Sequence, residues 1–215
     1  MMIKGVIFDM DGVLVDSEKF ILEAAMAFLK EQGITTQKED FLPFVGTGED
    51  RFIGGPAEKY GLKLDLKKAK DRTYDIYVKL IKGRLNPLPG VHEFINKCKA
   101  NGLKIAVASS ADEVKVLANL QEINLPLKTF NVIINGVQVK NKKPAPDIFI
   151  MAAEKMGLDP KACLVVEDAV SGVAAAKAAG AKCLALTTTF TKDKLKGADF
   201  FAENLATAPK EALEW

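Results

Sequence analysis

The chain has 215 residues, 48% of them apolar and 27% charged, and its 30 lysines and arginines nearly balance 28 aspartates and glutamates. These values are typical of a globular protein with one large domain, or with one domain and a small insert. A net charge of +2 excludes the concentrated basic composition of many nucleic-acid-binding proteins. Neither a signal peptide nor a membrane-length apolar stretch is evident, so we expect a cytoplasmic protein without nucleic-acid or membrane partners.

Short apolar segments, rich in β-branched residues, predict buried strands. They are Ile3–Phe8, Lys104–Ala108, Val132–Ile134, Cys163–Val166 and Cys183–Leu186. Helical patterns lie between the later strands, at Val91–Ala100, Asp112–Leu120, Asp147–Met156 and Val170–Ala179. Strands that alternate with helices predict an α/β fold, a Rossmann-like three-layer core with a parallel sheet.

Residues 17–84 break this alternation. Glu18–Gln32 and Lys67–Lys82 have the spacing of amphipathic helices, and no strand pattern lies between them. We therefore expect an inserted α-helical cap domain at 17–84, within an α/β core domain formed by 1–16 and 85–215. The chain re-enters the core at Asn86-Pro87-Leu88-Pro89-Gly90, because paired prolines make a stiff connector.

Reactive polar groups follow three of the predicted strands. The first runs into Asp9-Met10-Asp11-Gly12, the second into Ser109-Ser110 and the fourth into Glu167-Asp168. Because parallel strands end at one edge of the sheet, where ligands bind, these groups should meet in one crevice. Clustered carboxylates repel one another, and hard oxygen ligands suit Mg²⁺. The sequence therefore predicts a magnesium site, although turns also favour acidic residues for purely local reasons.

A positive charge is available in Lys143. It precedes Pro144-Ala145-Pro146, and a residue before proline is held away from helical conformation. This rigid approach to a helix start can aim the ammonium group into the crevice. The neighbouring Lys140 and Lys142 are more typical of a solvated charge run.

Together these residues resemble the haloacid dehalogenase-like superfamily. Four motifs carry the resemblance: Asp9-Met10-Asp11-Gly12-Val13-Leu14-Val15-Asp16-Ser17-Glu18, Ser109, Lys143-Pro144-Ala145-Pro146-Asp147 and Glu167-Asp168. They stand in the family's order, and the match extends to about residue 190. The nearest branch is similar to β-phosphoglucomutase and the small phosphatases, which have a helical cap after the first motif.

The resemblance implies a role for each residue. Asp9 is the nucleophile that forms an aspartyl-phosphate, and Asp11 is the general acid and then the base. Ser109, with Ser110 beside it, and Lys143 hold the phosphoryl group. Mg²⁺ is bound by Asp9, Asp11 through its backbone carbonyl, and Asp168, while Glu167 assists directly or through water. Such roles are chemically sound, because a covalent intermediate divides one difficult displacement into two easier ones.

The glycine-rich segment Val45–Arg51 is the most distinctive part of the insert. It is interpreted either as a plain loop between cap helices or as a substrate-specificity loop in which Thr47, Glu49 and Arg51 face the crevice. A true β-phosphoglucomutase is expected to have a histidine near Ile21 and an arginine near Glu49. This chain has neither, although Arg51 is close, and its single histidine, His92, lies in a predicted core helix.

The sequence therefore predicts a Mg²⁺-dependent phosphatase acting on a small phosphorylated metabolite, such as a sugar phosphate or phosphoglycolate. The alternative is a sugar-phosphate mutase of the β-phosphoglucomutase type. A more remote alternative is a binding module that has lost catalysis, but its expected mark is the loss of Asp9, Asp11 or Lys143. We expect a monomer or weak homodimer.

Overall fold

The computed structural model describes residues 2–44 and 48–215, which fall into two compact units. One unit contains the residues up to Asp16 together with Asn86–Trp215, and the other contains Ser17–Leu85. The chain thus leaves the first unit once and returns to it once. No described helix has both the length and the apolar character needed to cross a membrane.

The first unit is built on a parallel sheet, which in the described part of the chain has six strands in the order β3-β2-β1-β4-β5-β6. The strands are β1 (Gly5–Phe8), β2 (Lys104–Ala108), β3 (Val132–Ile134), β4 (Cys163–Glu167), β5 (Lys182–Leu186) and β6 (Phe200–Ala202). The five strands expected from the sequence are present, with small differences at their ends. The edge strand β6 was not predicted.

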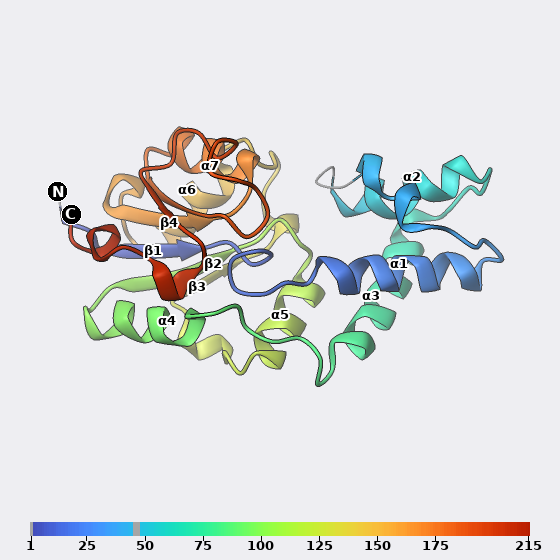
Figure 1. The fold of residues 1–215 in the computed structure, drawn as a ribbon, viewed down its shortest axis with the longest axis horizontal. Helices are drawn as coiled ribbons and strands as arrows, with labels where there is room; N and C mark the ends of the chain where they lie inside the picture. Colours follow the sequence, from blue (N-terminus) through green and yellow to red (C-terminus); the bar gives the residue numbers. More distant parts are fainter. Residues whose placement is uncertain (1, 45–47) are drawn as a thin grey trace. The chain divides into compact units, whose positions relative to one another are not determined.

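Helices cover both faces of this sheet (Figure 1). The helices are α4 (Val91–Ala100), α5 (Glu113–Glu122), α6 (Asp147–Lys155) and α7 (Val170–Ala178). Figure 1 shows α4 and α5 on one side of the sheet and α6 and α7 on the other. Short 3₁₀ helices complete the unit: η3 (Leu127–Thr129), η4 (Gly136–Gln138), η5 (Pro160–Ala162), η6 (Leu205–Thr207) and η7 (Lys210–Leu213). The predicted three-layer α/β fold is confirmed.

Alternate residues of β1 explain why this strand is apolar throughout. Ile7 packs into the core beneath α6 and α7, which includes Phe149 and Val173. The next residue, Phe8, points to the opposite face, where its ring meets Phe94 of α4 edge-on at 6.0 Å. A central parallel strand is buried on both faces and therefore needs a continuous apolar run.

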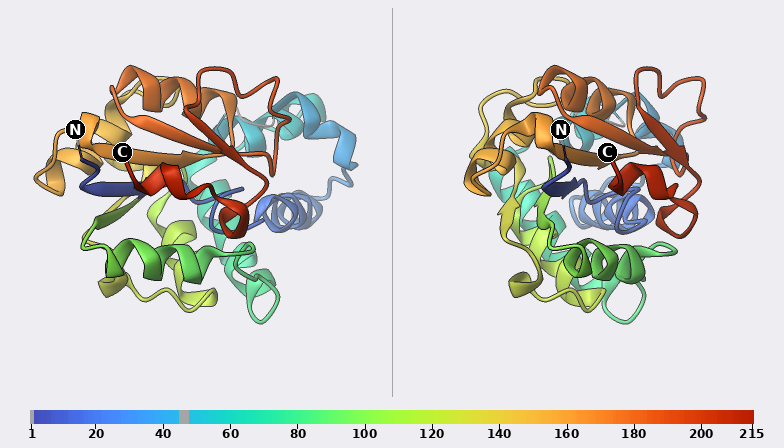
Figure 2. Two further views of the ribbon diagram at one scale, coloured as in Figure 1. Left: turned by 60° about the vertical axis from the view of Figure 1, so that its left-hand side comes forward. Right: turned by 90° about the vertical axis from the view of Figure 1, so that its left-hand side faces the viewer.

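The two ends of the described chain lie side by side in the first unit (Figure 2). The Ile3 amide donates to the Trp215 carbonyl at 2.9 Å. The Trp215 indole donates to the Ala212 carbonyl at 3.0 Å, and the Lys182 ammonium lies 4.3 Å from the centre of its ring. The last residue is thus packed against β5 of its own unit.

The second unit contains helices joined by turns and loops, and no strand lies in its described residues. It contains α1 (Glu18–Glu31), η1 (Lys38–Asp40), η2 (Leu42–Phe44), α2 (Glu49–Lys59) and α3 (Leu66–Ile81). Its core joins residues from each α-helix with Phe41, which lies between η1 and η2. The helical residues are Phe28, Leu29, Ile53, Ala57 and Ala69. One interpretation of Val45–Arg51 was a plain loop between cap helices. The structure differs for its last residues, because Gly48 precedes α2 and Glu49–Arg51 form the first turn of that helix.

Asp40 ties η1 to the end of α2. Its carboxylate accepts from the Lys59 ammonium at 2.5 Å, the Gln37 amide at 2.8 Å and the Tyr60 hydroxyl at 2.9 Å. The Lys59 bond, followed by the bonds from Gln37 and Tyr60, lowers the pKa of Asp40 to about 2. The folded unit thus binds this proton less tightly than the unfolded chain does.

An Asp40→Asn variant is expected to be less stable than the wild type at neutral pH. A depressed pKa gives stability that is present above the unfolded pKa, near about 4, and is lost as the pH falls toward about 2. The difference between wild type and variant should therefore shrink over that interval in urea unfolding at several pH values. Asp71→Asn, at an exposed site in α3, is the control, and a pH-independent difference would contradict the assignment.

Candidate active site

The first strand delivers Asp9 to the carboxyl edge of the sheet. Phe8 pairs with Val107 of β2 and with Val166 of β4, and the Asp9 amide donates to the Val166 carbonyl at 3.0 Å. Asp9 is thereby placed beside the end of β4, whose last residue is Glu167 and which is followed by Asp168. The sequence places these residues far apart, and the sheet register brings them together.

Lys143 binds two of these carboxylates. Its ammonium donates to Asp9 Oδ1 at 2.5 Å and to Glu167 Oε1 at 2.6 Å. Its side chain is 8% exposed, and that of Glu167 is 1% exposed. Lys143 is therefore a buried counter-charge to these carboxylates and differs from the exposed Lys140.

Glu167 is held from its other side by the start of the following helix. Its Oε2 accepts from the amides of Asp168 and Ala169, each at 2.9 Å. A Cβ atom on Gly172 of α7 would lie 1.8 Å from Glu167 Oε1, so the glycine makes room for the carboxylate. Both oxygens of Glu167 are thus engaged within the protein, which favours an assisting role over direct binding of a ligand.

A loop after β5 holds Asp168 and the first motif. The Thr189 hydroxyl donates to Asp168 Oδ2, and the Thr188 hydroxyl donates to the Gly12 carbonyl at 2.5 Å. Gly12 has φ of +75°, and a Cβ atom there would lie 1.8 Å from Asp168 Oδ2. The sequence reasoning missed Thr188 and Thr189, whose only signal was their place just beyond a predicted strand.

Crowding changes the acidity of these groups. Burial, opposed by Lys143 and assisted by Glu167, raises the pKa of Asp9 to about 7. Burial and the neighbouring charges of Glu167 and Asp9 raise the pKa of Asp168 to about 8. Burial alone would lower the pKa of Lys143, but Asp9 and Glu167 outweigh it and raise that pKa. The site therefore disfavours the charged forms of Asp9 and Asp168.

The cluster has the donor set of a divalent-cation site. Ligand oxygens of Asp9, Glu167 and Asp168 lie within 4.8 Å of one another, and all three residues are buried. Hard carboxylate oxygens suit Mg²⁺, and the three carboxylates of this cluster lie beside the ammonium group of Lys143, which contacts Asp9 and Glu167. The residues present therefore fit such an ion. The Asp11 side chain is not part of this cluster.

Asp11 has a partner that the sequence reasoning missed. Its Oδ2 accepts from the Lys115 ammonium of α5 at 3.0 Å. The Lys115 side chain is 7% exposed, whereas that of Asp11 is 26% exposed. The two predicted catalytic aspartates are thus paired with different lysines, Asp9 with Lys143 and Asp11 with Lys115.

The serines lie where β2 ends. Ser109 is buried, its amide donates to the Ile134 carbonyl at 3.0 Å, and its hydroxyl oxygen accepts from the Ala111 amide at 3.1 Å. The following Ser110 is exposed. Ser109 therefore reaches the same edge of the sheet as Asp9, as the predicted phosphoryl-binding residue must.

The candidate specificity residues belong to the second unit. Thr47 lies outside the described residues. Arg51 forms an exposed ion pair with Glu58 at 3.2 Å, and its guanidinium lies 5.3 Å from the centre of the Phe44 ring. Arg51 and Glu49 both lie in the first turn of α2, so their facing a substrate stays a prediction.

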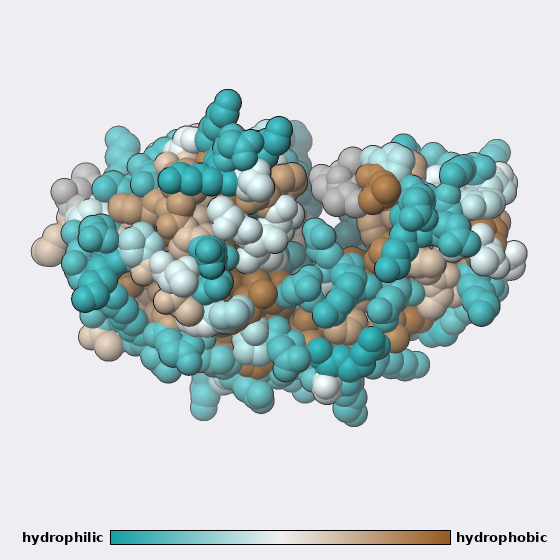
Figure 3. Space-filling model, viewed as in Figure 1, coloured by the Kyte–Doolittle hydropathy of each residue, from teal (hydrophilic) through white to brown (hydrophobic). Residues whose placement is uncertain are grey.

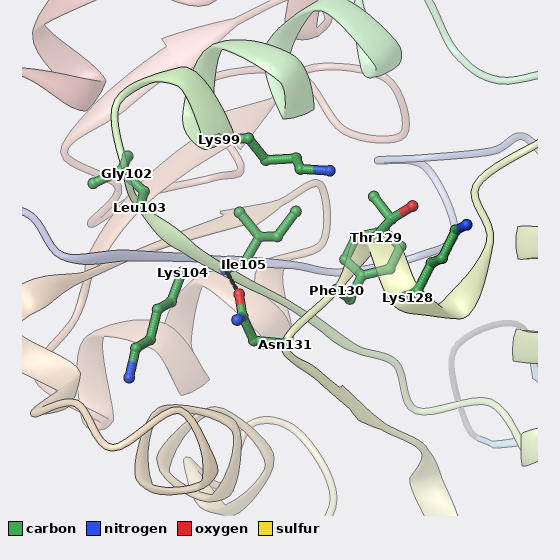
Figure 4. Close-up of a pocket in the computed structure, with 9 residues that line it drawn as sticks. All are labelled: Lys99, Gly102, Leu103, Lys104, Ile105, Lys128, Thr129, Phe130 and Asn131. Carbon is green, nitrogen blue, oxygen red and sulfur yellow. Dashed lines mark hydrogen bonds between the residues drawn. The ribbon is translucent and has the colours of Figure 1, made fainter.

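Two surface features lie apart from this cluster. A shallow cavity of about 340 Å³ lies at the opposite, amino-terminal edge of β2 and β3 (Figure 4). There the Ile105 amide donates to Asn131 Oδ1 at 2.8 Å, and the Lys104 ammonium donates to the Met156 carbonyl at 2.6 Å. Hydrophilic residues are spread widely over the face seen in Figure 3.

A parallel sheet with a buried acidic cluster and a lysine at its carboxyl edge is typical of α/β enzymes, which bind their ligands at that edge. The family model described as "Haloacid dehalogenase-like hydrolase" matches residues 6–186. The chain belongs to this haloacid dehalogenase-like hydrolase family, which confirms the resemblance seen in its motifs.

Two similar proteins show different extents of match. The chain is 44% identical over 199 residues to Protein SUPPRESSOR OF QUENCHING 1, chloroplastic, of Arabidopsis thaliana, covering 91% of this chain but 19% of that longer protein. It is 33% identical over 177 residues to Phosphorylated carbohydrates phosphatase of Thermotoga maritima, covering 82% of each. The prediction of a hydrolase is confirmed, and relatives of this kind support phosphoric monoester hydrolysis.

Solved structures share the fold. CbbY from Rhodobacter sphaeroides, in complex with phosphate, has a TM-score of 0.85 at 25% identity, covering 95% of this chain and 96% of that chain. β-Phosphoglucomutase from Clostridium difficile has a TM-score of 0.82 at 23% identity, covering 98% and 95%. The second likeness shows the fold alone, and the small-phosphatase branch named in the sequence analysis is supported by the relative named Phosphorylated carbohydrates phosphatase.

Proposed function

We propose that this protein is a Mg²⁺-dependent phosphatase of small phosphorylated metabolites, chiefly sugar phosphates, acting through an aspartyl-phosphate on Asp9. The observation that carries the proposal is the contact of Asp9 with Lys143 beside the buried Glu167 and Asp168. The substrate class is supported by the relative named Phosphorylated carbohydrates phosphatase.

In the first half of the reaction, a carboxylate oxygen of Asp9 forms a bond to phosphorus while the ester P–O bond breaks. The leaving oxygen takes a proton from Asp11, which becomes a carboxylate. Lys143 holds Asp9 in place and balances its charge, since its ammonium is only 2.5 Å from Asp9 Oδ1. Ser109 and Lys143 steady the phosphoryl oxygens. Positioning and charge balance of this kind account for most catalysis of phosphoryl transfer.

In the second half, Asp11 takes a proton from water as the water oxygen attacks phosphorus. The bond between Asp9 and phosphorus breaks, inorganic phosphate leaves, and both aspartates return to their starting states. General acid–base help from Asp11 is worth about 10²- to 10⁴-fold in rate.

Asp9, Asp168 and the backbone carbonyl of Asp11 would hold Mg²⁺, with Glu167 assisting. When bound, the ion supplies positive charge to the phosphoryl oxygens. The Thr188 and Thr189 hydroxyl groups fix the neighbouring Gly12 carbonyl and Asp168 carboxylate. The helical unit, 17–84 by the sequence, is proposed as a cap that excludes water from the crevice.

The mutase remains the second candidate, but the sequence disfavours it. A mutase must hold a bisphosphate intermediate through its second phosphate, and the histidine expected near Ile21 of α1 is absent. The single histidine, His92, lies in α4 of the first unit. A phosphatase needs only water to attack the aspartyl-phosphate.

A substrate panel tests the proposal. Sugar phosphates, phosphoglycolate and β-glucose 1-phosphate are each incubated with Mg²⁺, and inorganic phosphate and isomer are both measured. We expect phosphate release that a chelator abolishes and that added Mg²⁺ restores. Isomerisation without phosphate release would favour the mutase, and no reaction with any ester would favour the binding module.

Location and assembly complete the proposal. We propose a cytoplasmic location and a monomer or weak homodimer, and both proposals are carried over from the sequence analysis. Gel filtration with light scattering measures the second of these directly.

A further inference from the structure

Lys115 is a buried cation outside the acidic cluster. It lies near the start of α5, a helix that is anchored in the core by Val116 and Leu120, both fully buried. Its side chain is 7% exposed, and its ammonium donates to Asp11 Oδ2 at 3.0 Å. Withdrawing a lysine ammonium from water is unfavourable unless the group is paired, so the contact with Asp11 is a specific feature of this fold.

The contact has a chemical consequence for Asp11. A lysine ammonium group has three hydrogens to donate and no lone pair with which to accept. Asp11 Oδ2 must therefore act as an acceptor while it faces Lys115.

We propose that Lys115 is a positioning residue, which holds the Asp11 carboxyl group in one orientation for proton transfer. This inference rests on the proposed function, in which Asp11 protonates the leaving oxygen as the ester P–O bond breaks. Lys115 does not touch phosphorus or Asp9 in this account. Its effect is to keep a donor oriented, and misplacing a catalytic group by about 1 Å commonly reduces the rate about 10²-fold.

The dependence on the leaving group separates this role from a structural one. An alkyl phosphate, such as a sugar phosphate, releases a strongly basic oxygen that needs a proton in the transition state. An aryl ester such as p-nitrophenyl phosphate releases a stable anion that needs little help. Loss of orientation at Asp11 should therefore slow the alkyl ester selectively.

The test compares kcat/KM for the best sugar phosphate of the panel and for p-nitrophenyl phosphate, because this parameter includes the step in which the leaving group departs. Lys115→Met is expected to lower the value for the sugar phosphate about 10²-fold. The value for p-nitrophenyl phosphate should fall by no more than about 3-fold, and Lys115→Arg should restore part of the loss. Lys115→Gln serves if the methionine variant fails to fold.

Two controls sharpen the comparison. Lys177→Met removes a lysine–aspartate pair of the same kind, at 2.6 Å from Asp199, and should leave the ratio between the two esters unchanged. In an Asp11→Asn background, adding Lys115→Met should change neither ester further, because the group that Lys115 positions has lost its proton-transfer role.

An equal loss with both esters, or a loss that adds to that of Asp11→Asn, would overturn the positioning role. A wild type that hydrolyses neither ester would overturn the proposed function, and this inference with it. The third outcome separates the two proposals. If the wild type hydrolyses both esters and Asp11→Asn slows the sugar phosphate, but Lys115→Met leaves the ratio of the two kcat/KM values unchanged, the inference alone is overturned.

Discussion

An Asp9→Asn variant is expected to fold normally and to lose turnover by about 10⁴-fold or more, because no other group can form the covalent intermediate. Asparagine has nearly the same shape as aspartate. Lys143 also keeps its second partner, Glu167 Oε1, at 2.6 Å. Burial raises the pKa of Asp9 to about 7, which means that the fold disfavours the charged form of this carboxyl group. A neutral amide at this position should therefore not destabilise the folded protein.

Steady-state phosphate release measures the loss, and circular dichroism with thermal unfolding checks the fold. Asp16→Asn, at an exposed position in the later part of the first motif with no role in the proposed reaction, is a matched control and should keep most of its activity. An Asp9→Asn enzyme that retained a near-normal rate would remove Asp9 from the mechanism.

Lys143→Met is expected to lose both activity and stability. The substitution leaves Asp9 and Glu167 buried without their shared cation, and removing one partner from a buried ion pair typically destabilises a protein by about 3–5 kcal/mol. The same change removes a group that holds the phosphoryl oxygens. Urea unfolding and phosphate release measure the two effects, with Lys140→Met at an exposed site as the control.

The stability loss in Lys143→Met should depend on pH. Lys143 lowers the pKa of Asp9, so its removal raises a pKa that burial has already brought to about 7. An acid with a raised pKa in the folded state favours folding at low pH, and that stability is lost as the pH rises through the folded pKa. The variant should therefore be more destabilised at about pH 8.5 than at about pH 6. The opposite trend would contradict the placement of Lys143.

Much of the α/β unit follows from local patterns in the sequence. Strands β1 and β4 are buried on both faces, which requires unbroken apolar runs, and such runs are visible in the sequence. The acidic residues after those runs meet because parallel strands share a carboxyl edge. Asp9, Glu167 and Asp168 could therefore be placed together before any coordinates existed.

The second unit was less predictable. Helix α2 contains Gly54, Gly55 and Pro56, which weaken helix propensity, and no helix was predicted over these residues. Packing decides the outcome there, since Ile53 and Ala57 of α2 are buried in the core of the unit. Tertiary contacts of this kind leave little trace in local sequence.

The partners of the site residues were the least visible part. Lys115 is 104 positions from Asp11 along the chain, and a single lysine in an amphipathic helix resembles any solvent-facing charge. Thr188 and Thr189 likewise follow a strand that carries no acidic residue. Their contacts arise only when the sheet brings the ends of its strands together.

The most direct test of the central claim is to trap the phosphorylated residue. Enzyme is mixed with substrate and Mg²⁺, quenched and reduced with borohydride, which converts an aspartyl-phosphate into homoserine, and its peptides are then analysed by mass spectrometry. We predict homoserine at position 9, and none with chelator present or in Asp9→Asn. Reduction at any other residue, or an unmodified Asp9 during rapid turnover, would contradict the account.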